Sequence, residues 1–104
     1  MYIGKVKVTN EWQKLETLIQ EQVSGQSAFS FDADTTYQLQ DESKYGVRLC
    51  EAASTPADEN DGFIIGGGIL GHYKPATGYN LYVRQVADTT CPPLLLKISA
   101  FEED

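Results

Sequence analysis

Chemically reactive side chains are scarce in this 104-residue chain, which has two cysteines and one histidine. Cys50 and Cys91 stand far apart without a C-x-x-C pair, so no disulfide framework is expected, although a single bridge between them stays open. A zinc site is hard to assemble from these residues and His72 unless a carboxylate completes it. The sequence therefore predicts no catalytic residue, no metal site and no cofactor.

Positive charge and long apolar runs are also lacking. The chain has 8 basic and 15 acidic residues, for a net charge of −7. Such a field repels phosphate backbones and anionic lipids, so neither nucleic acid nor a membrane is an expected partner. No stretch approaches the roughly 20 apolar residues of a membrane span, and the first twenty residues lack a signal-peptide pattern. The expected location is the cytoplasm.

Alternation of apolar and polar residues is the dominant pattern that is present. Its clearest instance is Tyr79–Val86, where apolar and polar side chains take turns along the backbone, as in a β-strand with one solvated face. Further strands are expected at Tyr2–Val8, Thr36–Gln40, Tyr45–Ala52, Phe63–Ile65, Ile69–Tyr73 and Leu94–Phe101. Turn signals separate them every 8–15 residues or so, which predicts one mainly β domain over residues 1–104. We expect an antiparallel β-sandwich or a partly open small barrel.

One segment departs from this alternation. Apolar residues fall at helical spacing in residues 11–23, Asn10 with Gln13 resembles a capping box, and Gly25 provides a stop. The pattern predicts one short N-terminal helix over residues 11–23. It would cover one face or end of the core, with Trp12 packed rather than functional.

The sequence also predicts the position of three expected strands in the fold. The lysines of Tyr2–Val8 would point outward and suit an edge strand. Ala28–Asp32 and Thr36–Gln40 alternate around the turn residues Asp32–Thr35, which predicts a hairpin. Phe63–Ile65 is apolar throughout and is expected to be a buried strand.

Two motifs with a chemical appearance are better explained structurally. The glycine-rich segment Gly66–Gly71 follows an apolar strand, but it leads into His72–Pro75, which is a poor helix, whereas a phosphate loop requires a helix N-terminus behind its glycines. Asp58–Gly62 fits no EF-hand register, although an irregular calcium site remains an alternative. His72 is interpreted as an ordinary strand or loop residue and Cys50 as a small core side chain. Paired carboxylates for glycoside chemistry stay open as an alternative.

The surface of the predicted sheet is the best functional candidate. If Leu81 and Val83 face the core, Tyr82 and Arg84 stand outward side by side on one strand. Tyrosine and arginine are the residue types that anchor protein interfaces, and tyrosine also stacks on sugars. The candidate interaction surface comprises Tyr82, Arg84, Tyr73 and Arg48.

Three strand motifs occur in a recognisable order. They are Tyr37–Gln40, then Val47–Glu51 followed by the acidic loop Pro56–Gly62, then Leu81–Arg84, all preceded by a tryptophan and spaced leucines. From Thr36 onward this order resembles small phage and prophage proteins of tail or virion type. The resemblance implies a β-rich virion-associated or host-interaction module without catalysis, and it brings no active site. Such proteins have an asparagine or glycine turn where this chain has Asp41–Lys44.

The resulting hypothesis is a non-enzymatic structural or interaction protein, prophage-encoded and associated with a virion or tail. Its partners would be virion proteins or further copies of itself in a homo-oligomer. A carbohydrate-binding module using the tyrosine faces is the first alternative. A small hydrolase using His72 or two carboxylates is the second.

Overall fold

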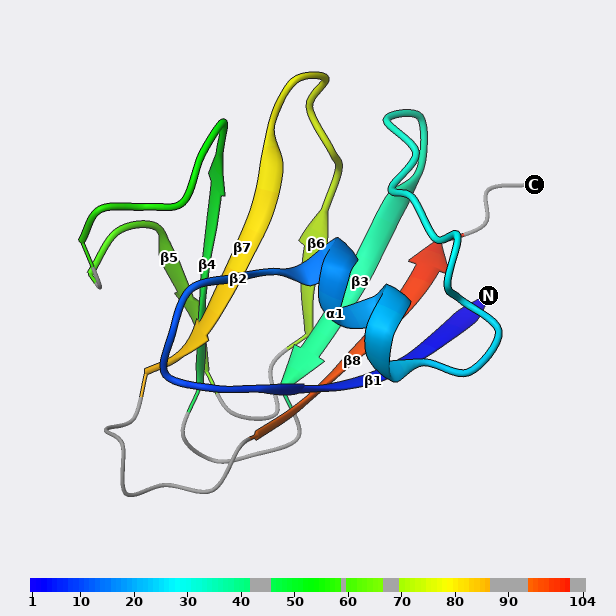
Figure 1. Ribbon diagram of the computed structural model, residues 1–104, viewed down its shortest axis with the longest axis horizontal. Coiled ribbons are helices and arrows are strands. Elements are labelled where there is room, and N and C mark those ends of the chain that lie inside the picture. Colours follow the sequence, from blue (N-terminus) through cyan, green and yellow to red (C-terminus); the bar gives the residue numbers. More distant parts are fainter. Residues whose placement is uncertain (42–45, 59, 67–69, 87–93, 102–104) are drawn as a thin grey trace.

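The computed structural model describes residues 1–41, 46–58, 60–66, 70–86 and 94–101 (Figure 1). These residues form eight strands and one short helix. The elements are β1 Tyr2–Val8, β2 Gln13–Lys14, α1 Leu15–Gln22, β3 Thr36–Asp41, β4 Val47–Ala52, β5 Phe63–Ile65, β6 Leu70–Tyr73, β7 Asn80–Gln85 and β8 Leu94–Phe101.

The strands form two antiparallel sheets of four strands each, which confirms the predicted β-sandwich. Sheet A has the order β1-β8-β3-β6, and sheet B has the order β2-β7-β4-β5. The first strand pairs with the last, the second with the seventh, the third with the sixth and the fourth with the fifth. This nested pairing is the connectivity of a jelly roll, in which a folded-over ribbon of strand pairs wraps into two sheets. The described strands do not close into a barrel.

The core lies between the two sheets and beneath α1. Each buried aliphatic side chain contributes roughly 1.5–3 kcal/mol to stability. The fully buried side chains of the core are Val6, Val8, Leu39, Leu96 and Ile98 of sheet A, Val47 and Val83 of sheet B, and Leu15 and Ile19 of α1. Two buried polar side chains are satisfied by backbone partners: Asp41 accepts from the Gly46 amide at 2.9 Å, and Gln85 donates to the Val8 carbonyl at 2.8 Å. The second bond ties β7 to β1 across the two sheets.

The helix is shorter than predicted and begins later. It spans Leu15–Gln22, and its N-terminal cap, Lys14, makes no side-chain capping bond. The expected capping box is wrong because Gln13 and Lys14 extend as β2 and pair with β7, so the chain is still in a strand where the helix was predicted. Gly25 adopts a φ of +81° just beyond the helix, in agreement with its expected role as a stop.

The first strand of the predicted hairpin does not form. Ala28–Asp32 is irregular, whereas the turn after it is confirmed by a bond from the Thr35 amide to the Asp32 carbonyl at 3.1 Å. Two side chains of α1 take the place of a partner strand. Gln20 donates to the Phe29 carbonyl at 2.7 Å, and Glu16 accepts from the Phe31 amide at 3.2 Å. Both phenylalanine rings nevertheless pack against the core.

The prediction that Phe63–Ile65 is a buried strand is half wrong. The segment is a strand, β5, but the Phe63 side chain is 82% exposed and Ile64 is 52% exposed. The reason is position, because β5 is the last strand of sheet B and pairs only with β4. Sequence alone predicts burial for an apolar run and does not reveal which strand ends a sheet.

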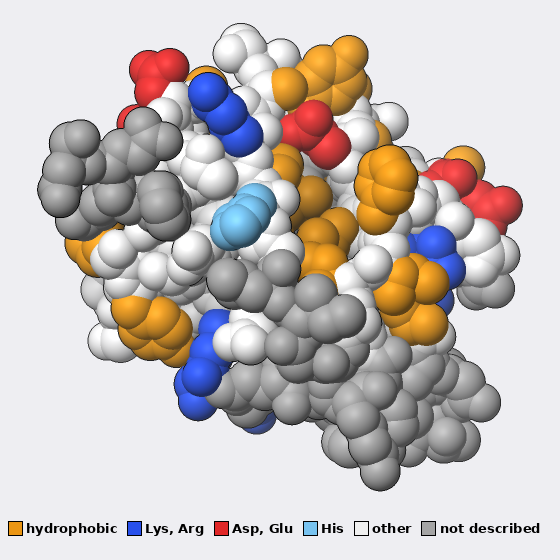
Figure 2. Space-filling view, turned by 180° about the vertical axis from the view of Figure 1, so that it is seen from behind, with side chains coloured by type: hydrophobic (Ala, Val, Ile, Leu, Met, Phe, Trp, Pro, Cys, Tyr) orange, Lys and Arg blue, Asp and Glu red, His pale blue; other side chains and the backbone are white. Residues whose placement is uncertain are grey.

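The two sides on which the sheets end are therefore different. On one side α1 contacts β1, β2 and β7 and closes the sandwich, as Figure 1 shows with the helix in front of the sheets. On the other side lie β5 and β6, with no described element over them. We call this second side the open edge. Figure 2 views the molecule from that side and shows hydrophobic side chains at its surface near the histidine.

Candidate functional site

Three of the four predicted surface residues do lie together on the outer face of sheet B. Leu81 and Val83 point into the core, so Tyr82 and Arg84 point away from it as predicted. The register between β4 and β7 sets Arg48 opposite Arg84. Cross-strand partners point to the same side of a sheet, so Arg48 joins them.

Tyr82 is nevertheless not an exposed anchor, because only 4% of it is accessible and it lies outside the main core. Trp12 and the loop between β4 and β5 fold over this face. The Trp12 indole donates to the Asp58 carbonyl at 3.1 Å, and the Arg84 guanidinium lies 5.7 Å from the centre of the Trp12 ring. Arg48 donates to the Asn60 carbonyl at 2.9 Å. These contacts form a second small layer, which we call the Trp12 cover.

Cys50 lies on the outer face of sheet B, next to Gly62 and Asp61 of the loop between β4 and β5, rather than in the core where it was predicted. It is opposite Tyr82 on the outer face and is half-buried. Burial raises the pKa of the Cys50 thiol, and the Asp61 carboxylate raises it further. Cys50 is a free cysteine in the structure, and Cys91, its potential partner in the sequence analysis, lies outside the described residues.

The acidic loop is organised by its own hydrogen bonds. Asp58 accepts from the Asn60 amide at 2.8 Å, and Asp61 accepts from the Asp58 amide at 3.2 Å. Over the stretches that the structure describes, no three histidine, cysteine or acidic side chains are placed to hold a metal ion. The carboxylates fix the loop conformation, which in turn places Asp58 under the Trp12 indole.

Tyr73, the fourth predicted surface residue, is on sheet A and apart from the other three. Tyr73 of β6 is the cross-strand partner of Tyr37 of β3. The Tyr73 ring lies 5.5 Å from the Phe31 ring and is nearly perpendicular to it. Its hydroxyl donates to the Glu51 carboxylate. Burial, followed by the bond to Glu51 and its negative charge, raises the pKa of Tyr73 well above its usual range. Tyr73 is an inward residue at one end of the sandwich.

A pocket of about 230 Å³ lies at that end. It is bounded by the junction of β2 and α1, by the irregular segment before β3, and by the turn between β6 and β7. Its aromatic side chains are Phe31, Tyr73 and Tyr79, and its polar side chains include Lys14, Glu16 and Asn80. Tyr79 stands at the rim and is 53% exposed. Sequence reasoning marked Tyr73 but missed the pocket, because its walls come from three separate segments.

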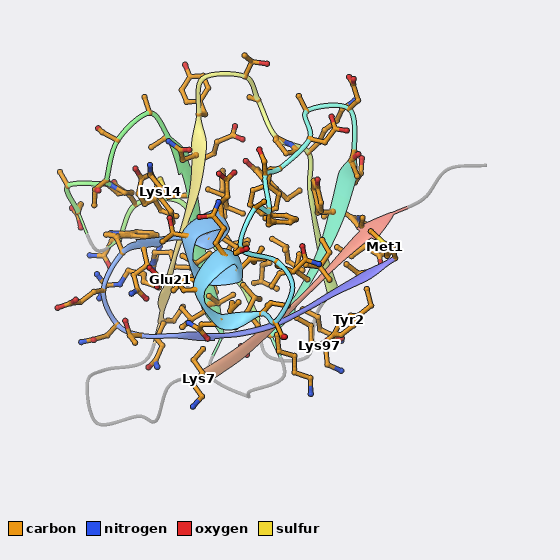
Figure 3. All side chains as sticks on the ribbon, turned by 45° about the vertical axis from the view of Figure 1, so that its right-hand side comes forward. Met1, Tyr2, Lys7, Lys14, Glu21 and Lys97 are labelled. Carbon is orange, nitrogen blue, oxygen red and sulfur yellow. The ribbon has the colours of Figure 1, made fainter. Side chains whose placement is uncertain are left out.

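The outer face of sheet A carries the histidine and a shallow hollow. His72 is exposed opposite Gln38, and it is the pale blue side chain in Figure 2. The hollow of about 190 Å³ is lined by Tyr2, Gln38, Gln40, Lys97 and Ser99. Figure 3 shows the Tyr2 and Lys97 side chains next to one another at this surface. None of the described residues that line this hollow is acidic.

The open edge exposes apolar side chains, among them Phe63 and Ile64 of the segment that was predicted to be buried. Ile64 and Val86 both approach within 4 Å of the point where a Cβ on Gly46 would lie, so they are neighbours. Val86 is 39% exposed, and Phe63 projects from the other face of β5. The apolar run Phe63–Ile65 is the sequence signal for this surface, but an apolar run by itself predicts burial inside the chain.

Comparisons with protein-family models, curated proteins and solved structures find no match to this chain. The fold and the sites described above define it as a small jelly-roll β-sandwich with an aromatic end pocket and a sheet edge over which no described element lies. Within the described ranges, no helix is long and apolar enough to cross a membrane.

Proposed function

We propose that this protein is a non-enzymatic structural module that assembles with further copies of itself through the open edge. The observation that carries this proposal is the exposure of Phe63 at 82% and Ile64 at 52% on a strand that ends its sheet. An apolar edge strand with unpaired peptide groups is a template for strand addition. Proteins that stay monomeric blunt such edges with charge, proline or a covering element.

The opposite side of the sandwich, which α1 closes, is protected in this way. β1 carries outward lysines, and the side chain of Gln22 occupies both hydrogen-bonding groups of Lys7. β2 is only two residues long and is followed directly by α1. The contrast between a protected side and an apolar open edge favours association through β5.

A second copy related by a two-fold axis fits the geometry of β5. Antiparallel pairing of two β5 strands about Ile64 sets Phe63 of each copy opposite Ile65 of the other, so each copy buries the same residues. The strand has three residues, so a single contact of this kind is weak, with a Kd in roughly the micromolar to millimolar range. Repetition of weak contacts in a large assembly raises the overall affinity.

A role in a phage virion or tail is the form of assembly that we propose. The resemblance of the strand motifs to small phage and prophage proteins supports it. Jelly rolls are also the architecture of many viral capsid domains, although the same fold hosts unrelated functions and the argument is one of analogy. A saccharide-binding role is favoured by a separate observation, the aromatic end pocket, and is compatible with assembly. The hydrolase hypothesis gains nothing from His72, whose strand partner Gln38 has no nucleophilic or acidic group.

The test is the mass of the protein in solution as its concentration rises. Sedimentation and light scattering up to about 1 mM should show the mean mass rising toward that of a dimer or larger species. Ile64→Lys should keep the chain monomeric while leaving its thermal midpoint nearly unchanged, because the side chain is half exposed. Tyr2→Lys is the matched control, since Tyr2 is 56% exposed on the other side of the molecule. A wild-type protein that stays monomeric over this range would refute the proposal.

A further inference from the structure

We propose that the pocket at the end of the sandwich, between Tyr73 and Tyr79, is a binding site for a neutral saccharide about one sugar ring in size. Its walls come from the junction of β2 and α1, from the irregular segment before β3 and from the turn between β6 and β7, so the site exists only in the folded chain. The mouth of a β-sandwich or barrel is a common place for small-ligand sites.

The aromatic wall of the pocket is fixed by ring packing. Phe31 lies 4.8 Å from Tyr37 and 5.5 Å from Tyr73, and both pairs are edge to face. Phe29 adds a further edge-to-face contact to Phe31 at 5.0 Å. Such pairs are worth about 0.5–1.5 kcal/mol each beyond the area they bury, and they restrict ring rotation. The pocket therefore offers a rigid apolar surface rather than a collapsible one.

The polar side of the pocket is fixed by Glu51, which lies behind the wall. Its carboxylate accepts from the Tyr73 hydroxyl and from the Ala76 amide at 3.2 Å. One carboxylate thus holds both the Tyr73 ring and the turn between β6 and β7. The turn ends at Gly78, whose φ is +86°, and leads directly to Tyr79 at the rim. Preorganised walls reduce the ordering cost of binding.

The chemistry of the lining selects the ligand class. Lys14 offers donors, Glu16 offers acceptors and Asn80 offers both, while the aromatic rings offer a flat apolar surface. A sugar ring has the matching character, with hydroxyl groups around its edge and C–H groups on its faces. An anion would meet Glu16 in a chain of net charge −7, and a purely apolar ligand would leave the polar side chains without partners.

The size of the pocket limits the ligand to one ring inside the site. Its volume of about 230 Å³ is below the roughly 300 Å³ at which pockets for drug-sized molecules begin. The exposed Tyr79 at the rim would stack on that ring or on the next one of an oligosaccharide.

The experiment uses the intact chain and a panel of neutral hexoses, pentoses and their disaccharides. Saturation-transfer NMR detects contact at sugar concentrations up to about 10 mM, where even a ligand of millimolar Kd fills most of the site. We expect the protons of at least one sugar to receive saturation from the protein. Tyr79→Ala should weaken that binding at least tenfold without unfolding the protein, because the side chain is half exposed.

Tyr2→Ala is the matched control, because Tyr2 is similarly exposed at 56% but lines a different hollow. The absence of binding by every sugar of the panel would overturn the proposal. Binding that survives Tyr79→Ala, or that is lost in Tyr2→Ala, would also overturn it. The outcome is independent of assembly, since Ile64→Lys, the monomeric variant, should bind the same sugar with unchanged affinity.

Discussion

The side-chain amide of Gln22 pairs with the peptide group of Lys7 as a neighbouring strand would. The Lys7 amide donates to Oε1 of Gln22 at 2.7 Å, and Nε2 of Gln22 donates to the Lys7 carbonyl at 3.2 Å. This pair joins the last turn of α1 to the outer edge of β1. It satisfies groups that would otherwise be open to pairing with another chain.

Removal of this amide should weaken the closed side of the sandwich. We expect Gln22→Ala to lower the free energy of unfolding by about 1–2 kcal/mol, because two hydrogen bonds are lost at an exposed position. Glu21→Ala, on the neighbouring exposed residue of α1, is the control and should change stability by less than about 0.5 kcal/mol. Denaturant unfolding of the two variants provides the measurement. Equal effects in both would show that the pair has no special role.

Two glycines with the same backbone conformation should respond differently to alanine. Gly25 and Gly62 have φ values of +81° and +85°, which costs alanine about 1–2 kcal/mol at either position. A Cβ at Gly25 meets nothing within 4 Å, whereas one at Gly62 would lie 2.0 Å from the Leu49 carbonyl oxygen. Gly62→Ala should therefore destabilise the protein clearly more than Gly25→Ala in thermal unfolding. A difference within experimental error would contradict the close approach of the loop to β4.

The Trp12 cover should protect Cys50 from alkylation. Burial and the Asp61 carboxylate both raise the pKa of this thiol, so little thiolate exists at neutral pH. Labelling of the Cys50 peptide, followed by mass spectrometry, should be slow at pH 8 and rise only above pH 9. Asp61→Asn should shift that rise to lower pH, and Trp12→Ala should accelerate labelling at every pH by uncovering the strand. Fast labelling of the wild type at pH 7 would refute this protection.

Tyr73 should make the protein sensitive to alkali. Its pKa is raised in the folded state, whereas in the unfolded chain it titrates near 10.0. Above that pH the unfolded state loses this proton and the folded state keeps it, so stability falls as the pH rises. The Tyr73→Phe variant has no phenol proton to lose, so its free energy of unfolding should fall less steeply above pH 10. The variant also lacks the bond to Glu51, which should lower its free energy of unfolding by about 1 kcal/mol at pH 7. Parallel slopes for the two proteins would exclude this role of Tyr73.

Much of the strand pattern could be predicted from alternation. β8 and β1 have the predicted bounds, and the turn at Asp32–Thr35 is confirmed. The errors arise where tertiary contacts replace local ones. Gln13 reads as part of a helix cap but pairs with β7, and Phe29 reads as strand but is bonded by a side chain of α1. Local patterns do not contain these partners.

The candidate sites were less predictable than the strands, for a related reason. Alternation gave the outward direction of Tyr82 but not the loop and indole that cover it. Hydropathy gave the apolar character of Phe63 but not its exposure, which depends on the order of strands in the sheet. The end pocket unites residues from three distant segments, and the sequence of a single chain contains no signal that they meet.

The nested pairing of the strands has a consequence for how the chain folds. β1 finds its partner only in β8, near the other end of the described chain, whereas β4 and β5 are neighbours in sequence. Contacts between distant segments slow folding, because a long loop must close before any of them forms. The β4–β5 hairpin is thus the natural starting point, and a chain still emerging from the ribosome cannot complete sheet A until residues 94–101 are free. Sheet A therefore reaches its native arrangement only after synthesis has passed β8.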